Sequence, residues 1–362
     1  MQSVKRVLVI NPGDTFTQIG VFDDDRCIFE RKVLHTRQEL TSFNSVADQV
    51  EYRKQIILGQ LFYEGINLSK LTAVCGKGGL LRPIDGGTYK VNHAMLYDLK
   101  TAAYGEHTSN LGGIIAYEIA TGLNIDSYIV DPVVVDELRD IARYSGIPEI
   151  PRRSIFHALN HKAAARKAAA ELQANYEDIN LIVVHIGRGI TVGAHQRGKV
   201  VDVNNGLDGE GPFSSERSGG VPVSELIKMC FSEAYSFETI FEYVEGSGGL
   251  NAYLQTNDIA EIEKRIDAGD SEAENVYRAM AYQISKEIGA MSVVLCGEVD
   301  AIVITGNLGN RSKLTKWIME RVNWIADMIV YPGENELQSL SEGVIRVLRN
   351  KEDSKIYSME EE

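Results

Sequence analysis

Arg6-Val-Leu-Val-Ile-Asn-Pro-Gly13 has a counterpart in the second half of the chain, Asn180-Leu-Ile-Val-Val-His-Ile-Gly187. The two segments align without a gap at an offset of 185 − 11 = 174 residues, nearly half of the 362 in the chain. In each copy an apolar strand ends in a polar residue and a glycine, and a second strand follows at 17–20 or 191–194. Such a repeat predicts a fold with two similar halves. Strand-glycine-strand hairpins also occur by chance, so the repeat alone leaves coincidence open.

The pattern around the repeat predicts an α/β protein. Alternating apolar residues predict two three-stranded meanders, at 4–10, 17–22 and 27–33 and again at 181–185, 191–195 and 199–204. Helical periodicity appears at 45–62, 110–121, 133–144, 155–173 and 271–295, and further strands at 73, 128 and 301–305. The repeat divides the chain into an N-terminal lobe at 1–175, a C-terminal lobe at 176–350 and a charged, frayed tail at 351–362.

Composition excludes several classes of protein. A net charge of -14 and a pI near 5.1 disfavour nucleic acid as a partner, since that affinity depends on Lys and Arg neutralising phosphates. The 4 cysteines show no CxxC spacing, and the 7 histidines form no metal-ligand pattern with them. No apolar run approaches the roughly 18 residues that cross a membrane. We therefore expect an unprocessed cytoplasmic protein with reduced thiols and no membrane partner.

Glycine-rich segments with polar residues follow several strands, where loops commonly carry function. In chain order they are INPG (10–13), GEHTSNLG (105–112), IVDPVVVDE (129–137), RRSIFHALNHKAAAR (152–166), VVHIGRG (183–189), VDVNNGLDGEGPFSSERSGG (201–220), GGLNAYLQTND (248–258), ITGNLG (304–309) and YPGENE (331–336). This series resembles butyrate kinases closely and acetate kinases more distantly, over about residues 4–345.

The resemblance implies a duplicated actin-like (ribonuclease H-like) ATPase fold, with two lobes around a central nucleotide cleft. It also implies reversible transfer of the γ-phosphoryl group of ATP to a short-chain carboxylate with Mg²⁺, and a homo-oligomer. A carboxylate is already ionised at neutral pH, so the reaction needs no general base. It needs cations and hydrogen-bond donors that stabilise charge on the phosphoryl oxygens.

Four residues are the candidate catalytic groups. Arg217 resembles the family arginine that clamps the phosphoryl group; the alternative is a surface ion pair with Glu216. His185, at the end of a strand, resembles a histidine that donates to phosphoryl oxygens; the alternative is a core histidine. His107 resembles the histidine near the acyl substrate, or it stands at a helix start. Asp131 follows a strand, where α/β folds collect catalytic groups.

Glycine turns let backbone N–H groups approach phosphate oxygens. The candidate nucleotide residues are Asn11, Gly13, Gly187 and Gly189 in the hairpins and Gly306, Asn307 and Gly309 beneath adenosine. For the carboxylate substrate the candidates are Lys77, Gly78 and His107. Glu336 resembles the glutamate that holds Mg²⁺ through water, with Asp131 nearby; Glu334 competes for this role, and stabilising a helix start is the alternative.

The sequence departs from the family where phosphate is expected. Asp14, Phe16 and Gln18 replace two hydroxyls and a lysine of the first hairpin, and Arg188 replaces a small residue of the second. Lys77 stands where relatives have arginine, so the bidentate grip on a carboxylate is lost. Since 14 + 174 = 188, Asp14 and Arg188 occupy equivalent positions, which indicates that they changed together. Either they pair and fill the phosphate space, or Arg188 replaces the lost lysine while Asp14 helps to hold magnesium.

Three hypotheses follow. An active butyrate-type carboxylate kinase is favoured by the retained residues, although the departures predict weakened activity. A catalytically impaired paralogue that binds a ligand or partner is favoured by the departures. A sugar kinase with the same duplicated core is disfavoured by the SERSGG segment, and fold resemblance alone does not establish activity.

Overall fold

In the computed structural model, which describes residues 3–358, the chain forms two compact units. The first unit contains the residues up to 135 together with those from 335 on, and the second contains residues 136–334. The predicted lobes at 1–175 and 176–350 rest on the repeat rather than on packing, and remain a prediction. Within residues 3–358 no helix combines the length and apolar character needed to cross a membrane.

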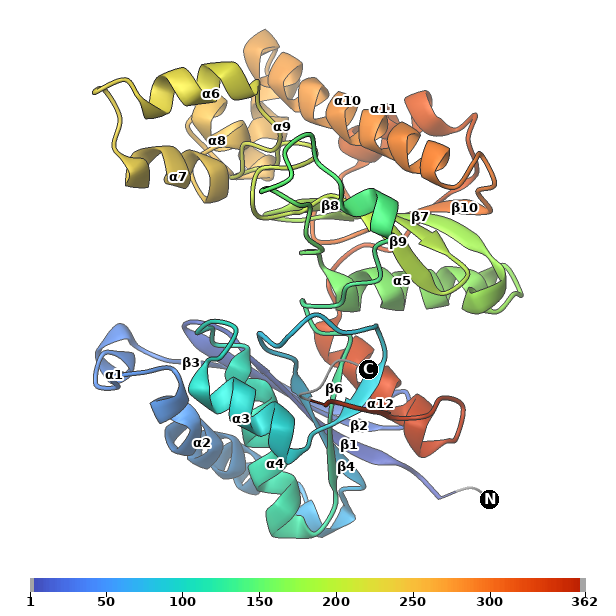
Figure 1. Ribbon diagram of the computed structural model, residues 1–362. Coiled ribbons are helices and arrows are strands. Elements are labelled where there is room, and N and C mark those ends of the chain that lie inside the picture. Colours follow the sequence, from blue (N-terminus) through green and yellow to red (C-terminus); the bar gives the residue numbers. More distant parts are fainter. Residues whose placement is uncertain (1–2, 359–362) are drawn as a thin grey trace. The chain divides into compact units, whose positions relative to one another are not determined.

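The elements alternate as the sequence pattern predicts (Figure 1). Those of the first unit are β1 (Arg6–Pro12), β2 (Phe16–Asp23), β3 (Arg26–Leu34), α1 (Arg37–Leu40), α2 (Val50–Tyr63), β4 (Ala73–Lys77), β5 (Thr88–Lys90), α3 (His93–Thr101), α4 (Asn110–Leu123), β6 (Asp126–Val130), α12 (Glu336–Leu348) and β12 (Lys355–Ile356). Those of the second are α5 (Ala158–Glu171), β7 (Asn180–Ile186), β8 (Ile190–Gln196), β9 (Lys199–Val203), α6 (Val223–Cys230), α7 (Phe237–Glu245), α8 (Gly249–Leu254), α9 (Ile259–Asp267), α10 (Ser271–Val294), β10 (Ala301–Thr305), α11 (Ser312–Val322) and β11 (Met328–Val330).

Each unit is built on a mixed sheet with the same core topology. The first sheet has the order β12-β5-β6-β4-β1-β2-β3, and the second has the order β11-β10-β7-β8-β9. In both, the repeated strand (β1 or β7) is antiparallel to the next strand along the chain and parallel to its other neighbour, β4 or β10. The duplication read from the sequence is therefore a duplication of topology.

The two hairpins have matching strand bounds but differ by one residue in the register of their pairing. Adding 174 to the bounds of β1 gives the bounds of β7, since 6 + 174 = 180 and 12 + 174 = 186. By the strand bounds, residues 13–15 connect the first hairpin and residues 187–189 the second. The pairing differs by one residue, because Pro12 pairs with Thr17 but Ile186 pairs with Ile190. Asp14 and Arg188 are each the middle residue of the connection between the two strands of their hairpin.

Alternation along the repeated strands places apolar side chains on both faces of each sheet. In β7, Ile182 and Val184 join the core that α10 helps to form, whereas Leu181 and Val183 pack against the alanines of α5. In the first unit, Leu8 of β1 belongs to the core formed with α2 and α4. The opposite face is covered by α12, drawn in red beside the blue strands in Figure 1.

Two local predictions were wrong. The helix expected at 133–144 is absent; this segment is mostly irregular and holds a short 3₁₀ turn, Asp140–Arg143. Its backbone bonds to other segments instead, as when Ile84 N–H donates to Val134 O at 3.3 Å and Arg139 N–H to Val201 O at 3.1 Å. The tail expected to fray is packed as far as Tyr357, whose hydroxyl donates to Asp98 at 2.6 Å. Residues 359–362 lie outside the described part of the chain.

Candidate functional site

Three predicted residues of the first unit meet at the start of α12. The side-chain amide of Asn11 donates to Glu336 at 2.6 Å, and Lys77 Nζ donates to both carboxylate oxygens of Glu336 at 2.9 Å. Glu336 is the first residue of α12, where the helix dipole stabilises a carboxylate. The helix-start role and the magnesium role predicted for Glu336 are therefore compatible. Its immediate neighbours are a cation and an amide.

The first turn is held from inside by Arg53, which is fully buried in α2. Its guanidinium donates to the carbonyl oxygens of Gly13 and Phe16, both at 2.9 Å. Burial is the largest influence on the guanidinium and lowers the pKa of Arg53. Arg53 was not among the residues predicted from the sequence. It could have been identified because it lies one turn before the buried Ile57 of α2, on the same face of the helix.

The departures from the family pattern change what the first turn contacts. A Cβ at Gly13 would lie 2.4 Å from the Phe16 ring, so the phenyl group covers the glycine that we assigned to phosphate. The Asp14 carboxylate accepts a hydrogen bond from Thr108 Oγ1 at 2.8 Å. Asp14 therefore has a partner within its own unit.

The loops after β4 and before α4 pack closely. A Cβ at Gly78 would lie 2.5 Å from Pro132 Cβ, and Asn110 Oδ1 accepts the Leu80 N–H at 2.8 Å. His107 is exposed. Its Nδ1 accepts the Ser109 N–H at 3.1 Å, so a neutral ring carries its proton on Nε2. This is the geometry of the helix-start alternative, and it leaves a donor on the outer side of the ring.

Asp131 is buried directly after β6. Its φ is +38°, a conformation that non-glycine residues seldom adopt and that is most frequent at functional sites. One carboxylate oxygen accepts the Gly87 N–H at 2.6 Å, and the Asp131 N–H donates to Gly87 O at 3.0 Å. The carboxylate is thus oriented by the loop before β5.

In the second unit, Arg217 lies against the hairpin turn. Its Nη1 donates to Gly206 O, and a Cβ at Gly189 would lie 2.1 Å from Nη1, so only glycine leaves room for the guanidinium. Burial, and then the charge of Arg188, lower the pKa of Arg217. Glu216 accepts from Arg188 Nε at 2.6 Å, and the surface ion pair that we considered for Arg217 is made by Arg188 instead.

His185 is the penultimate residue of β7 and is fully buried. Neither ring nitrogen makes a hydrogen bond within residues 3–358, although Nε2 lies 3.1 Å from a carboxylate oxygen of Glu334. The ring stacks on His157 with centroids 3.8 Å apart, and a Cβ at Gly187 would lie 3.0 Å from Nε2. Buried polar atoms almost always have partners, so His185 is suited to a ligand that supplies acceptors. Sequence reasoning missed His157, which no spacing rule connects to His185.

The predicted adenosine turn adjoins the same hairpin. Gly306 has φ +95°, and a Cβ there would lie 2.4 Å from Ile186 O. Gly309 N–H donates to Gly306 O at 3.0 Å, which closes the turn, and Asn307 between them is exposed. Gly306 also pairs with Gly333, next to Glu334. The predicted residues of the second unit therefore come together around the end of β7.

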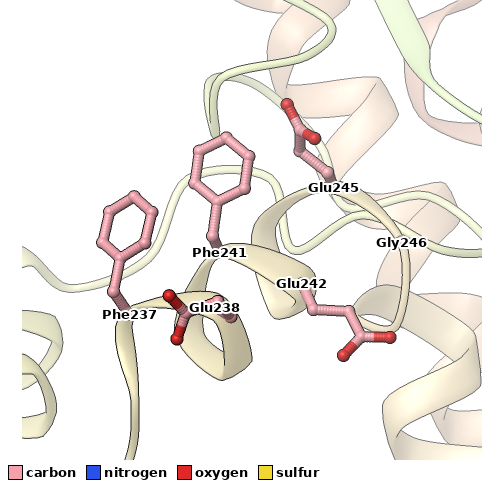
Figure 2. A pocket seen from close by; sticks show the side chains of 6 residues that line it. All are labelled: Phe237, Glu238, Phe241, Glu242, Glu245 and Gly246. Atoms are coloured by element: carbon pink, nitrogen blue, oxygen red, sulfur yellow. The ribbon is translucent and has the colours of Figure 1, made fainter.

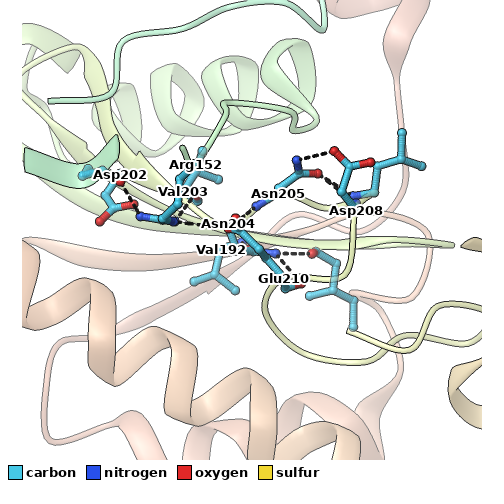
Figure 3. Close-up of polar contacts among 11 residues, drawn as sticks. Arg152, Val192, Asp202, Val203, Asn204, Asn205, Asp208 and Glu210 are labelled. Atoms are coloured by element: carbon cyan, nitrogen blue, oxygen red, sulfur yellow. Dashed lines mark hydrogen bonds and ion pairs between the residues drawn. The ribbon is translucent and has the colours of Figure 1, made fainter. Parts of the chain in front are cut away.

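A polar network fixes the loop that carries the acceptor for Arg217 (Figure 3). Arg152 donates to Asp202 at 2.9 Å and to Glu210 at 3.4 Å, and Asn204 Oδ1 accepts the Val192 N–H at 2.7 Å. These contacts tie the segment around Gly206 to β8 and β9. Sequence reasoning did not assign Arg152 a role, although it begins one of the quoted motifs.

One hollow of the second unit lies on α7, and none of the predicted site residues lines it. A hollow of about 520 Å³ on α7 is lined by Phe237, Phe241, Gly246 and the three carboxylates of Glu238, Glu242 and Glu245 (Figure 2). Those carboxylates repel a polyphosphate. Among residues 3–358 no group of three or more His, Cys, Asp or Glu side chains is arranged to hold a metal. A magnesium ion that keeps most of its waters needs only one or two carboxylates.

Comparison with known families matches residues 148–357 to the acetokinase family, more than half of the chain. The chain belongs to the acetokinase family. It is therefore a kinase that transfers a phosphoryl group to a carboxyl group, and its family implies the use of ATP and the binding of a nucleotide and a carboxylate. This membership disfavours the sugar-kinase hypothesis.

Solved structures confirm the predicted fold class. The acetate kinase of Porphyromonas gingivalis is 18% identical with a TM-score of 0.79, and the match covers 94% of this chain and 99% of that one. A propionate kinase from Francisella tularensis is 17% identical with a TM-score of 0.69, covering 94% and 98%. A putative N-acetylmannosamine kinase from Listeria monocytogenes is 14% identical with a TM-score of 0.53, covering 96% and 100%. At these identities the likeness concerns the fold alone.

Proposed function

We propose that this protein transfers the γ-phosphoryl group of ATP reversibly to butyrate or a branched short-chain acid. The observation that carries the proposal is the group of donors around the second hairpin. Arg217 lies over Gly189, and the buried His185 has its Nε2 3.1 Å from a Glu334 carboxylate oxygen, while its Nδ1 makes no hydrogen bond among residues 3–358. A migrating phosphoryl group carries negative charge on its oxygens, and such preorganised donors stabilise it.

We assign the carboxylate substrate to residues of the first unit. Lys77 supplies a cation at the end of β4, and His107 supplies an N–H group at Nε2. The packing of Gly78 against Pro132 supports a fixed loop beside them. The motif series that resembles butyrate kinases favours butyrate over acetate as the substrate.

We assign magnesium to Glu336, with Asp131 as the second carboxylate. Glu336 is partly exposed, with a side-chain accessibility of 22%, and its charge is balanced by Lys77. Magnesium bound through water would compete with this ammonium group for the carboxylate. Gly187, Gly189, Gly306, Asn307 and Gly309 are assigned to the nucleotide.

Initial rates of acyl-phosphate formation with acetate, propionate, butyrate and isobutyrate, trapped as hydroxamates, test the proposal. The kcat/KM ratio is expected to be highest for butyrate or isobutyrate. A preference for acetate would contradict the assigned substrate, and no product with any acid would contradict the assigned activity.

A catalytically impaired paralogue is the second candidate, favoured by the phenyl ring of Phe16 over Gly13. Under this hypothesis the double substitution Asp14→Ser with Arg188→Gly raises nucleotide affinity. Thermal stabilisation by MgATP measures this, because at a fixed ligand concentration tighter binding raises the unfolding midpoint further, with the logarithm of the affinity. An unchanged midpoint shift in the double variant would contradict the hypothesis.

A further inference from the structure

A continuous line of polar side chains runs through the interior of the second unit. Tyr176 OH lies 2.7 Å from His195 Nδ1, and His195 Nε2 lies 3.2 Å from His161 Nδ1. His161 Nε2 lies 2.8 Å from Thr191 Oγ1, which lies 3.0 Å from His157 Nδ1. The line therefore ends at the ring that stacks on His185.

The line is built by secondary structure. His157 and His161 are four residues apart at the start of α5, and Thr191 and His195 are four residues apart on one face of β8. A Cβ at Gly193, between the latter two, would lie 3.2 Å from His161 Nδ1, so glycine makes room for the imidazole. Such a site is formed by the fold and not by chance contact of surface groups.

The two central rings are neutral. His161 and His195 are fully buried, and burial lowers the pKa of each well below its usual value. The positive charges of Lys162 and Arg166 lower the pKa of His195 further. A neutral imidazole has one N–H and one lone pair, so each ring must donate on one side and accept on the other.

This requirement gives the whole line a single direction. An imidazole nitrogen is a better acceptor than a phenol oxygen, so the Tyr176 hydroxyl donates to His195 Nδ1. His195 Nε2–H then donates to His161, and His161 Nε2–H donates to Thr191 Oγ1. The Thr191 hydroxyl donates in turn to His157 Nδ1, which leaves the proton of His157 on Nε2. Hydrogen bonds arranged in one direction polarise and strengthen one another.

We propose that Tyr176, His195, His161 and Thr191 form a relay that fixes the tautomer of His157 and thereby the position of His185. These four are positioning residues, and no proton needs to be transferred along them. The relay rests on the proposed function only because His185 is there assigned to the phosphoryl group. The relay requires two contacts of the His157 ring. Thr191 bonds to its Nδ1, and His185 stacks on one of its faces, with the two rings 17° from parallel.

Nitrogen-15 labelling of histidine with long-range proton–nitrogen NMR correlation reads the tautomers of the ligand-free protein. In the wild type, His157, His161 and His195 are expected as Nε2–H rings. Tyr176→Phe removes the donor at the start of the line, and a second tautomer should appear at His195 and at His157. The matched control is Tyr331→Phe, which removes a hydroxyl that donates to Glu171 at 2.6 Å in the same unit.

A second pair of variants addresses the possibility that Tyr176→Phe does not fold. Thr191→Ser keeps the hydroxyl and should retain the wild-type tautomer of His157, whereas Thr191→Val should lose it. The same loss should lower kcat about ten-fold or more with an unchanged KM for the carboxylate, as for other groups that orient a working histidine. Rescue by serine separates positioning from packing.

An Nε2–H tautomer of His157 that persists in both Tyr176→Phe and Thr191→Val would overturn the relay. The NMR readout does not depend on turnover. If the tautomers change as expected while no acid is phosphorylated, the relay stands and the proposed function fails. If butyrate is phosphorylated and the tautomers do not change, the proposed function stands and the relay fails.

Discussion

Replacing Gly189 by alanine should disable Arg217 without unfolding the protein. The added Cβ would lie 2.1 Å from Nη1, whereas ordinary contact begins at about 3.4 Å, so the guanidinium must move by about 3.4 − 2.1 = 1.3 Å. A displacement of about 1 Å at a reacting centre can lower turnover about 100-fold, equivalent to about 2.7 kcal/mol. Gly189 lacks a left-handed φ, so alanine fits the backbone.

The assay is kcat for acyl-phosphate formation with butyrate, together with urea unfolding. The matched control is Gly289→Ala in α10 of the same unit, where an added Cβ meets nothing within 4 Å. That substitution should leave kcat unchanged and add about 0.5–1 kcal/mol of stability, as is usual in a helix interior. Wild-type kcat in Gly189→Ala would show that the position of Arg217 over the turn does not matter.

A double-mutant cycle with Arg217→Ala separates the clash from other damage. Once the guanidinium is absent, the added methyl group at Gly189 has no side chain to displace. The two substitutions should therefore be strongly non-additive. A loss in kcat on Gly189→Ala that is equal in both backgrounds would mean that the alanine acts through the nearby Gly206 carbonyl and not through Arg217.

The other predictions concern stability and phosphate binding. Arg53→Met removes the guanidinium that donates to the carbonyl groups of the first turn and should destabilise the protein by about 3 kcal/mol in urea unfolding. Lys54→Met, which breaks two partly exposed ion pairs with Glu51 and Glu118, should cost under about 1 kcal/mol. Equal losses would contradict the role assigned to Arg53. Burial lowers the pKa of His35 to about 4, so the unfolded state binds more protons than the folded state between about pH 4 and 6.5. The free energy of unfolding should therefore rise with pH across this window, and its slope should be shallower in His35→Gln. An identical slope in the variant would contradict this assignment to His35. Glu216→Gln should tighten MgATP binding several-fold and Arg188→Gly should weaken it, as followed by calorimetry, if Arg188 takes the place of the lost lysine; opposite signs would favour the impaired-paralogue hypothesis.

Much of the fold could be predicted because the decisive signals are local. The bounds of β1 and β7 follow from apolar runs that end in a polar residue and a glycine. The helix expected at 133–144 does not form. Residue spacing alone does not show which groups the backbone will form hydrogen bonds with. Here Val135 bridges Ile84, and Arg139 donates to Val201. A segment whose backbone groups form hydrogen bonds with distant segments does not need to form a helix to satisfy them.

The sequence predicted which residues of the second hairpin lie near one another, but not the contacts that they make. Arg217, His185 and the glycines of the second hairpin do come together. That Glu216 pairs with Arg188 could not be predicted, because Glu216 is adjacent to Arg217 in the sequence and either arginine could pair with it until the loop is folded. Arg53 and the histidines of the relay were also missed. Their partners lie on other elements, and a polar residue in an apolar pattern does not reveal what satisfies it.

Phosphorus-31 NMR of the wild-type protein with MgATP and butyrate decides whether this chain is a working carboxylate kinase. The account predicts that the ATP resonances decline while those of ADP and an acyl phosphate grow, and that the acyl phosphate does not form when Arg217 is replaced by alanine. ATP that remains intact with butyrate, isobutyrate and acetate alike would contradict it. Acyl phosphate formed equally well by the Arg217→Ala variant would contradict the role assigned to that residue.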